Sequence, residues 1–141
     1  MILLDTSVLS RVFRRRRMGP SEHRLGTAVE RLMNSDADVG LPGIVLQEVL
    51  SGIRSEEQFS DLERRLVNAF TILHAQTPDH VEAARLKNRC LAKGLTASGP
   101  DCLIATLTIA GNHILFALDD DFRAIAKHSD LKLVSTSGFA V

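Results

Sequence analysis

The chain contains no tryptophan and no tyrosine, and only six of its 141 residues are phenylalanine. The core must therefore be built from aliphatic side chains, and the 45% of hydrophobic residues is ample for one. This content argues against a disordered chain. The same shortage of aromatics leaves little base stacking, so a nucleic-acid partner would be bound mainly through its shape and its phosphates.

Cysteines, net charge and long apolar runs are also scarce. Cys90 and Cys102 are too few and too poorly spaced for a zinc site, and their apolar helical surroundings predict buried free thiols of a reducing cytosol. The 17 basic and 17 acidic residues cancel, so any nucleic-acid contact would need a local patch. Asp5 follows the first apolar residues too soon for a signal peptide. No run approaches the roughly 18 apolar residues of a membrane span. We expect a soluble, cytoplasmic protein.

Short apolar runs alternate with amphipathic segments along the whole chain, without repeats or a linker. This alternation predicts one domain over residues 1–141, an α/β protein whose three-layer α/β/α sandwich has a mainly parallel sheet of about four or five strands. The expected strands are Ile2–Leu4, Ala37–Leu41, Thr71–Leu73, His113–Leu118 and Leu131–Val134. The expected helices are Thr6–Phe13, Ser21–Asn34, one from about Pro42 to Ile53, Glu56–Phe70, Pro78–Lys93, Pro100–Ala110 and Phe122–Lys127.

Four acidic residues lie at positions that this fold would bring to one edge of the sheet. Asp5 and Asp119 end the first and fourth predicted strands, and ligands of such sheets bind beyond the carboxyl ends of the strands. Glu48 and Asp101 fall near the starts of helices that can begin at the same edge. Gathered carboxylates repel one another unless they are neutralised, and hard divalent cations with oxygen ligands are the usual solution. The pattern therefore predicts a metal centre.

Each acid also has a purely structural interpretation. Asp5 could cap the helix that begins at Thr6, and Asp101, three residues after Ser98, could complement a helix dipole. The three aspartates Asp119–Asp121 could form a turn and an N-cap. Glu48 lies nearly opposite the apolar stripe of its helix, so its carboxylate could simply face solvent. A capping role does not explain Glu48.

The segments around these acids together resemble the PIN-domain nucleases, in particular the VapC-type toxins of toxin–antitoxin pairs. The matching motifs are Leu3–Leu9 with Asp5, Leu46–Gly52 with Glu48, Gly99–Ala105 with Asp101, and Leu118–Phe122 with Asp119. The last motif of the family usually has threonine where this chain has Ala117. The aspartate triplet leaves open whether Asp119 or Asp121 is the nearer ligand, and Asp119 is preferred because it is closest to the strand end.

The resemblance implies Mg²⁺- or Mn²⁺-dependent cleavage of RNA by a homodimer that a cognate antitoxin holds inactive. Asp5 and Asp101 are then the central metal ligands, Glu48 and Asp119 are flanking ligands or water-holders, and Asp121 is a further candidate ligand. The hydroxyl of Thr6 or Ser7 would orient water, although a helix N-cap explains it equally well. No histidine or lysine beside these motifs suggests a general base, so water activated by the metal is the expected nucleophile.

A dense basic run could hold the RNA phosphates. It comprises Arg14, Arg15, Arg16 and Arg17, with Arg11 one turn earlier. A solvated surface loop is the competing interpretation. His113, at the start of a predicted strand, should lie far from the acidic edge and be structural.

Other functions remain open from the residues alone. A housekeeping PIN-family RNA-processing nuclease would share the same motifs. A phosphatase or phospho-acceptor domain also places aspartate and Mg²⁺ at a strand end, but its phosphatase pattern requires a second aspartate at the position of Ser7. A non-catalytic binding domain would use the carboxylates only as caps.

Overall fold

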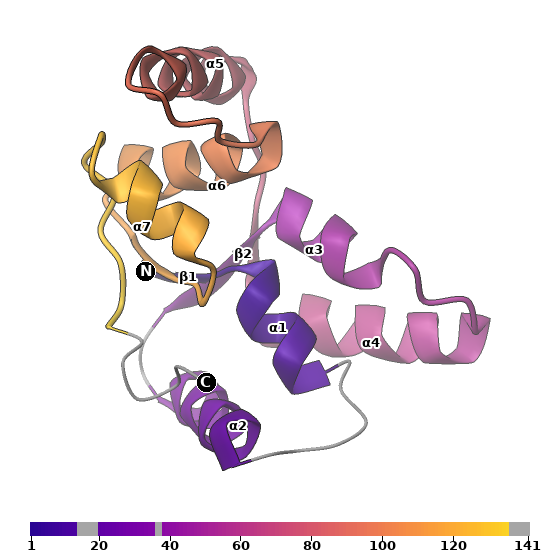
Figure 1. The fold of residues 1–141 in the computed structure, drawn as a ribbon. Coiled ribbons are helices and arrows are strands. Elements are labelled where there is room, and N and C mark those ends of the chain that lie inside the picture. The colour runs from indigo at the N-terminus through magenta and orange to yellow at the C-terminus, as the bar shows by residue number, and fades with distance from the viewer. Residues whose placement is uncertain (14–19, 36–37, 136–141) are drawn as a thin grey trace.

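Four short apolar segments form the sheet at the centre of the protein. The computed structural model describes residues 1–13, 20–35 and 38–135. The strands are β1 (Ile2–Leu4), β2 (Val39–Pro42), β3 (Thr71–Leu73) and β4 (Ile114–Phe116), in the order β3-β2-β1-β4. All three pairings are parallel, and helices cover both faces, so continuous apolar runs suit these strands. The predicted three-layer α/β/α sandwich is confirmed (Figure 1).

The predicted fifth strand at Leu131–Val134 is wrong. This segment meets the edge strand β4 at a single parallel bridge, between Leu133 and Leu115. Leu115 donates its N–H to the carbonyl of Lys132 at 2.9 Å, and Val134 donates to the carbonyl of Leu115 at 2.8 Å. A single bridge does not make a strand, so this segment only lies against the edge of the sheet.

The helices agree with the predicted segments to within one or two residues, except for α3. They are α1 (Thr6–Phe13), α2 (Pro20–Asn34), α3 (Gly43–Leu50), α4 (Glu56–Ala69), α5 (Thr77–Ala92), α6 (Gly99–Ala110) and α7 (Asp120–Ala126). Helix α3 ends at Leu50, and Gly52 then adopts a positive φ of 90°, so Ile53 lies outside the helix. In Figure 1, α5 and α6 lie on one side of the sheet and α1 and α2 on the other.

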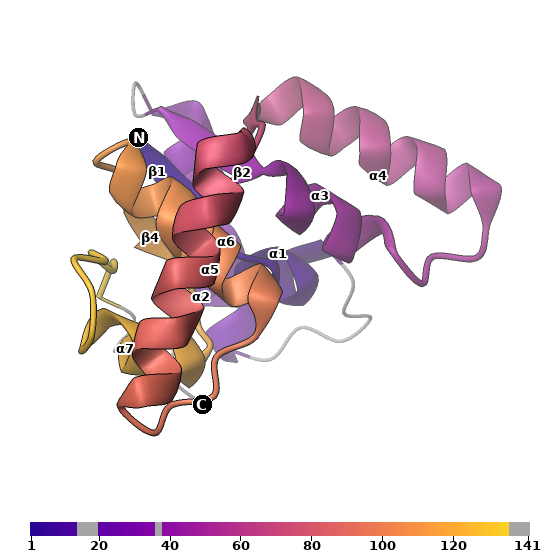
Figure 2. The same cartoon turned by 90° about the horizontal axis from the view of Figure 1, so that it is seen from above.

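Aliphatic side chains from all layers fill the core. Leu3, Leu41 and Leu115 of the sheet are fully buried, together with Ile104 of α6. Helix α6 is apolar nearly all round because it lies between other elements: α5 packs along its outer side, as the view from above shows (Figure 2). The buried hydroxyl of Thr108 in this helix donates to the carbonyl of Ile104 at 2.8 Å. Cys90 and Cys102 are buried and free, as predicted.

The parallel arrangement brings several chain segments to one edge of the sheet. Helix α1 leaves β1 there, α3 leaves β2 and α7 follows β4, while the first turn of α6 contributes Asp101. This edge is called the carboxyl edge below. Among the helices of the described ranges, none is long and apolar enough to cross a membrane.

Candidate metal centre

Asp5 is buried at the carboxyl end of β1, where only 4% of its surface is exposed. Its N–H donates to the carbonyl of Phe116 at 2.9 Å, which extends the pairing of β1 with β4. Its Oδ2 accepts the backbone N–H of Ser7 at 3.0 Å and the Ser7 hydroxyl at 2.7 Å. Asp5 therefore caps α1 in addition to any other role. Burial raises the pKa of Asp5; the Ser7 hydrogen bonds oppose this rise, and the charge of Asp119 adds to it.

Three further aspartates meet beside it. Asp101, Asp119 and Asp121 each offer an oxygen that lies within 4.8 Å of the others. Asp119 is the N-cap of α7, and its Oδ1 accepts the backbone N–H of Asp121 at 3.0 Å. Asp101 is not a cap, because Ser98 caps α6 by accepting the Asp101 N–H at 3.2 Å. Both Asp119 and Asp121 belong to the cluster, so the arrangement does not decide which of them is the nearer candidate ligand.

Electrostatics link Asp5 to this cluster. Burial, together with the charges of Asp5, Asp119 and Asp121, raises the pKa of Asp101 from 3.8 to about 6. Asp101 is half-buried, so its carboxylate is only partly screened by water. The acids from β1, α6 and the start of α7 thus act on one another as a single negative centre.

Glu48 joins the carboxyl edge through Thr6. The half-buried carboxylate of Glu48, on α3, accepts the Thr6 hydroxyl at 3.1 Å. Thr6 directly follows Asp5, so this bond ties α3 to the start of α1. The hydroxyls of Thr6 and Ser7 both donate to carboxylates, and their predicted role in orienting water stays a prediction.

The donor set suits a hard divalent cation. Every group in the cluster is a carboxylate, and oxygen ligands on short side chains are what Mg²⁺ and Mn²⁺ prefer. The three aspartate oxygens lie within 4.8 Å of one another, close enough for small side-chain movements to bring more than one of them to a common ion. The residues present therefore fit a divalent metal at this edge.

Two contacts that the sequence did not predict hold this centre in place, one from Ser7 and one from Lys87. The Ser7 hydroxyl also accepts the backbone N–H of Leu118 at 2.9 Å, across the gap between β1 and β4. Lys87 of α5 donates to the carbonyl of Ala97 at 2.7 Å and so fixes the loop before Asp101. A serine two residues after an aspartate is a local signal for the Asp5–Ser7 bonds, but the Leu118 contact joins residues 111 apart in sequence. The Lys87 contact has no local signal, since its acceptor is a backbone carbonyl.

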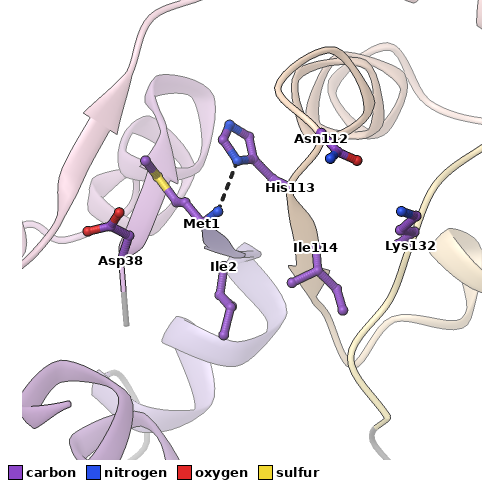
Figure 3. A pocket seen from close by; sticks show the side chains of 7 residues that line it. All are labelled: Met1, Ile2, Asp38, Asn112, His113, Ile114 and Lys132. Carbon is purple, nitrogen blue, oxygen red and sulfur yellow. Dashed lines mark hydrogen bonds between the residues drawn. The ribbon is translucent and has the colours of Figure 1, made fainter. Parts of the chain in front are cut away.

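The opposite edge of the sheet carries a hollow of about 390 Å³ with different chemistry (Figure 3). Its lining includes Asp38, His113 and Lys132. Nδ1 of His113 lies 3.3 Å from the amino group of Met1, and burial, assisted by that positive charge, lowers the pKa of His113. His113 thus lies at the amino ends of the strands, away from the acids, as predicted.

The predicted basic run can be followed only in part. Arg11 lies on α1 and is half-buried. Arg14 to Arg17 lie outside the described residues.

The fold and this acidic centre define an α/β protein with a carboxylate site at the carboxyl edge of a parallel sheet. Residues 2–128 match the PIN domain family. The chain belongs to that family, as the four motifs predicted.

Solved structures with the same fold cover almost the whole chain. FitAcB from Neisseria gonorrhoeae is 21% identical with a TM-score of 0.75, covering 96% of this chain and 97% of that one. A toxin–antitoxin complex from Klebsiella pneumoniae is 18% identical, with a TM-score of 0.73 and complete coverage of both chains. VapC20 from Mycobacterium tuberculosis, a Sarcin-Ricin loop cleaving toxin, is 18% identical with a TM-score of 0.66, covering 94% and 99%.

The raised pKa of Asp101 predicts how stability depends on pH without metal. The folded state binds this proton more tightly than the unfolded state, so stability is lost as pH rises from about 4 to about 6. Asp101→Asn removes this penalty. After allowance for solvent screening, we expect a gain on the order of 1 kcal/mol at pH 7 and less at pH 4.5. Urea unfolding in EDTA measures both values.

The exposed Asp61 on α4 provides the matched control, because Asp61→Asn changes the same group outside the cluster. This control should show no comparable gain at pH 7. An Asp101→Asn variant that is no more stable than wild type at pH 7 would contradict the predicted cost of the buried, repelled Asp101 charge.

Proposed function

We propose that this chain is an Mg²⁺- or Mn²⁺-dependent endoribonuclease and the toxin component of a toxin–antitoxin pair, acting in the cytoplasm. Membership of the PIN domain family and the fold shared with VapC structures support a nuclease. The single observation that carries the metal dependence is the meeting of Asp101, Asp119 and Asp121 oxygens within 4.8 Å, beside the buried Asp5.

The proposed roles follow from where each carboxylate lies. Asp5 is buried and Asp101 is half-buried, whereas Asp119 and Asp121 are exposed, so Asp5 and Asp101 are proposed as the central metal ligands. Asp119 and Glu48 flank them, with Asp121 as a further ligand. Hydrolysis of an RNA phosphodiester requires attack by water on phosphorus, in line with the leaving oxygen. A bound divalent cation supplies activation of that water and relief of charge on the phosphate and leaving oxygen.

The chain's own residues supply placement. The Thr6 hydroxyl holds the Glu48 carboxylate and the Ser7 hydroxyl holds the Asp5 carboxylate, so neither carboxylate rotates freely. The Ser98 cap and the Lys87 contact keep the first turn of α6, and with it Asp101, at the edge. Ordered carboxylates reduce the cost of organising the reacting groups.

Partners are inferred from the named relatives. The Klebsiella pneumoniae structure is a toxin–antitoxin complex, and VapC20 cleaves the Sarcin-Ricin loop, which supports an antitoxin partner and an RNA substrate for this chain. A homodimer is part of the proposal. Arg11, with Arg14 to Arg17, is assigned to the RNA phosphates, because few aromatics are available to stack on bases.

RNA cleavage in vitro tests the proposal directly. Asp5→Asn and Asp101→Asn should each reduce Mn²⁺-dependent cleavage of total RNA by about 100-fold or more, because each removes a charged ligand. Excess EDTA should abolish wild-type cleavage. Gel analysis of the products, with circular dichroism to confirm folding, gives the measurement.

The aspartate triplet offers a matched control. Asp120 points to Arg123 of its own helix at 2.9 Å and is not part of the cluster, so Asp120→Asn should retain activity. Full activity in the Asp5 or Asp101 variant, or undiminished cleavage in EDTA, would overturn the mechanism.

Growth on expression separates a toxin from a housekeeping nuclease. Expression of the wild-type chain alone in a bacterial host should arrest growth, because nothing then restrains RNA cleavage. Asp5→Asn, expressed to the same level, should permit growth. Normal growth with the active wild-type protein would favour a housekeeping PIN-family nuclease.

A further inference from the structure

Ser7 contacts two strand ends with one hydroxyl group. This residue is the second of α1, and its Oγ donates to Asp5 Oδ2 at 2.7 Å. The same oxygen accepts the backbone N–H of Leu118 at 2.9 Å. Leu118 lies just beyond β4 and directly precedes Asp119. Ser7 therefore links the carboxylate of one strand end to the backbone that carries another.

The contact with Leu118 replaces a bond that the sheet cannot make. Asp5 donates its N–H to the carbonyl of Phe116, and continued parallel pairing would bring the Leu118 N–H to the carbonyl of Asp5. That carbonyl is already used by α1, since it accepts the N–H groups of Val8 at 3.1 Å and Leu9 at 3.3 Å. The Ser7 hydroxyl oxygen replaces the Asp5 carbonyl as the acceptor for the Leu118 N–H.

The direction of both bonds is fixed by chemistry. A backbone N–H can only donate, so the Ser7 oxygen must accept from Leu118. The single hydroxyl proton then remains for Asp5 Oδ2, which is the acceptor a carboxylate provides. One side chain thus sets the orientation of Asp5 and the distance from Asp5 to the start of the Asp119 turn.

We propose that Ser7 is the positioning residue of the metal centre, holding Asp5 and Asp119 at the separation that a shared divalent cation requires. This inference rests on the proposed function. Thr6 differs from Ser7, because its hydroxyl donates to the carboxylate of Glu48 on α3. Groups that orient a metal ligand commonly change metal affinity by about 10- to 100-fold when they are removed.

Calorimetric titration of metal-free protein with Mn²⁺ alone tests this role, without RNA or activity. Ser7→Ala should bind Mn²⁺ about 10- to 100-fold more weakly than wild type. Ser7→Thr keeps the hydroxyl and should bind nearly as tightly as wild type. Ser7→Cys has a somewhat larger side chain that offers only weak hydrogen bonding, so it should behave like Ser7→Ala.

Ser129 provides the matched control, since its hydroxyl also bridges two backbone groups. Its Oγ donates to the carbonyl of Ile125 at 2.9 Å and accepts the N–H of Leu131 at 3.3 Å, beyond the other end of α7. Ser129→Ala should lose stability in EDTA and keep wild-type Mn²⁺ affinity. This comparison separates the loss of a hydrogen-bonding hydroxyl from the loss of a positioned ligand.

The outcomes distinguish the two proposals. Absence of Mn²⁺ binding by wild type defeats the proposed function and, with it, the role of Ser7. Wild-type binding with equal affinity in folded Ser7→Ala defeats the role of Ser7 alone. If Ser7→Ala does not fold, Ser7→Cys decides: affinity equal to that of Ser7→Thr overturns the inference, and weakened affinity supports it.

Discussion

Mutual repulsion among carboxylates at the carboxyl edge is the constraint around which this protein is organised. Asp5 is almost fully buried, and the burial of Asp101, followed by the charge of Asp5, raises the pKa of Asp101 to about 6. Such a concentration of negative charge lowers the stability of the metal-free fold. The aliphatic core, with Leu3, Ile104 and Leu115 fully buried, provides the hydrophobic stabilisation that holds these groups together.

Two of the proposed metal ligands are also helix caps. Asp5 accepts the Ser7 N–H at the start of α1, and Asp119 accepts the Asp121 N–H at the start of α7. Each cap occupies an identified oxygen and fixes the side chain that carries it. A structural interpretation of these aspartates is therefore correct, and it is compatible with the proposed metal binding because a capped carboxylate is also an oriented one. Asp101 stands apart, since Ser98 caps its helix.

Much of the fold could be predicted from local patterns. Four of the five expected strands exist, because continuous apolar runs suit a sheet covered on both faces. The positions of Asp5 and Asp119 followed from strand ends alone. Glu48 could not be placed with the same assurance, since its contact with Thr6 joins residues 42 apart in sequence. The segment Leu131–Val134 is apolar enough for a strand, yet only the three-dimensional course of the chain determines that it meets β4 once.

The most direct test of the central claim is an anomalous difference map from crystals of this protein soaked in Mn²⁺. We predict a peak at the carboxyl edge, within coordination distance of oxygens from Asp5 and Asp101 and of at least one of Asp119 and Asp121. An edge without a peak at saturating Mn²⁺, with the carboxylates ordered and in the same arrangement, would contradict the account.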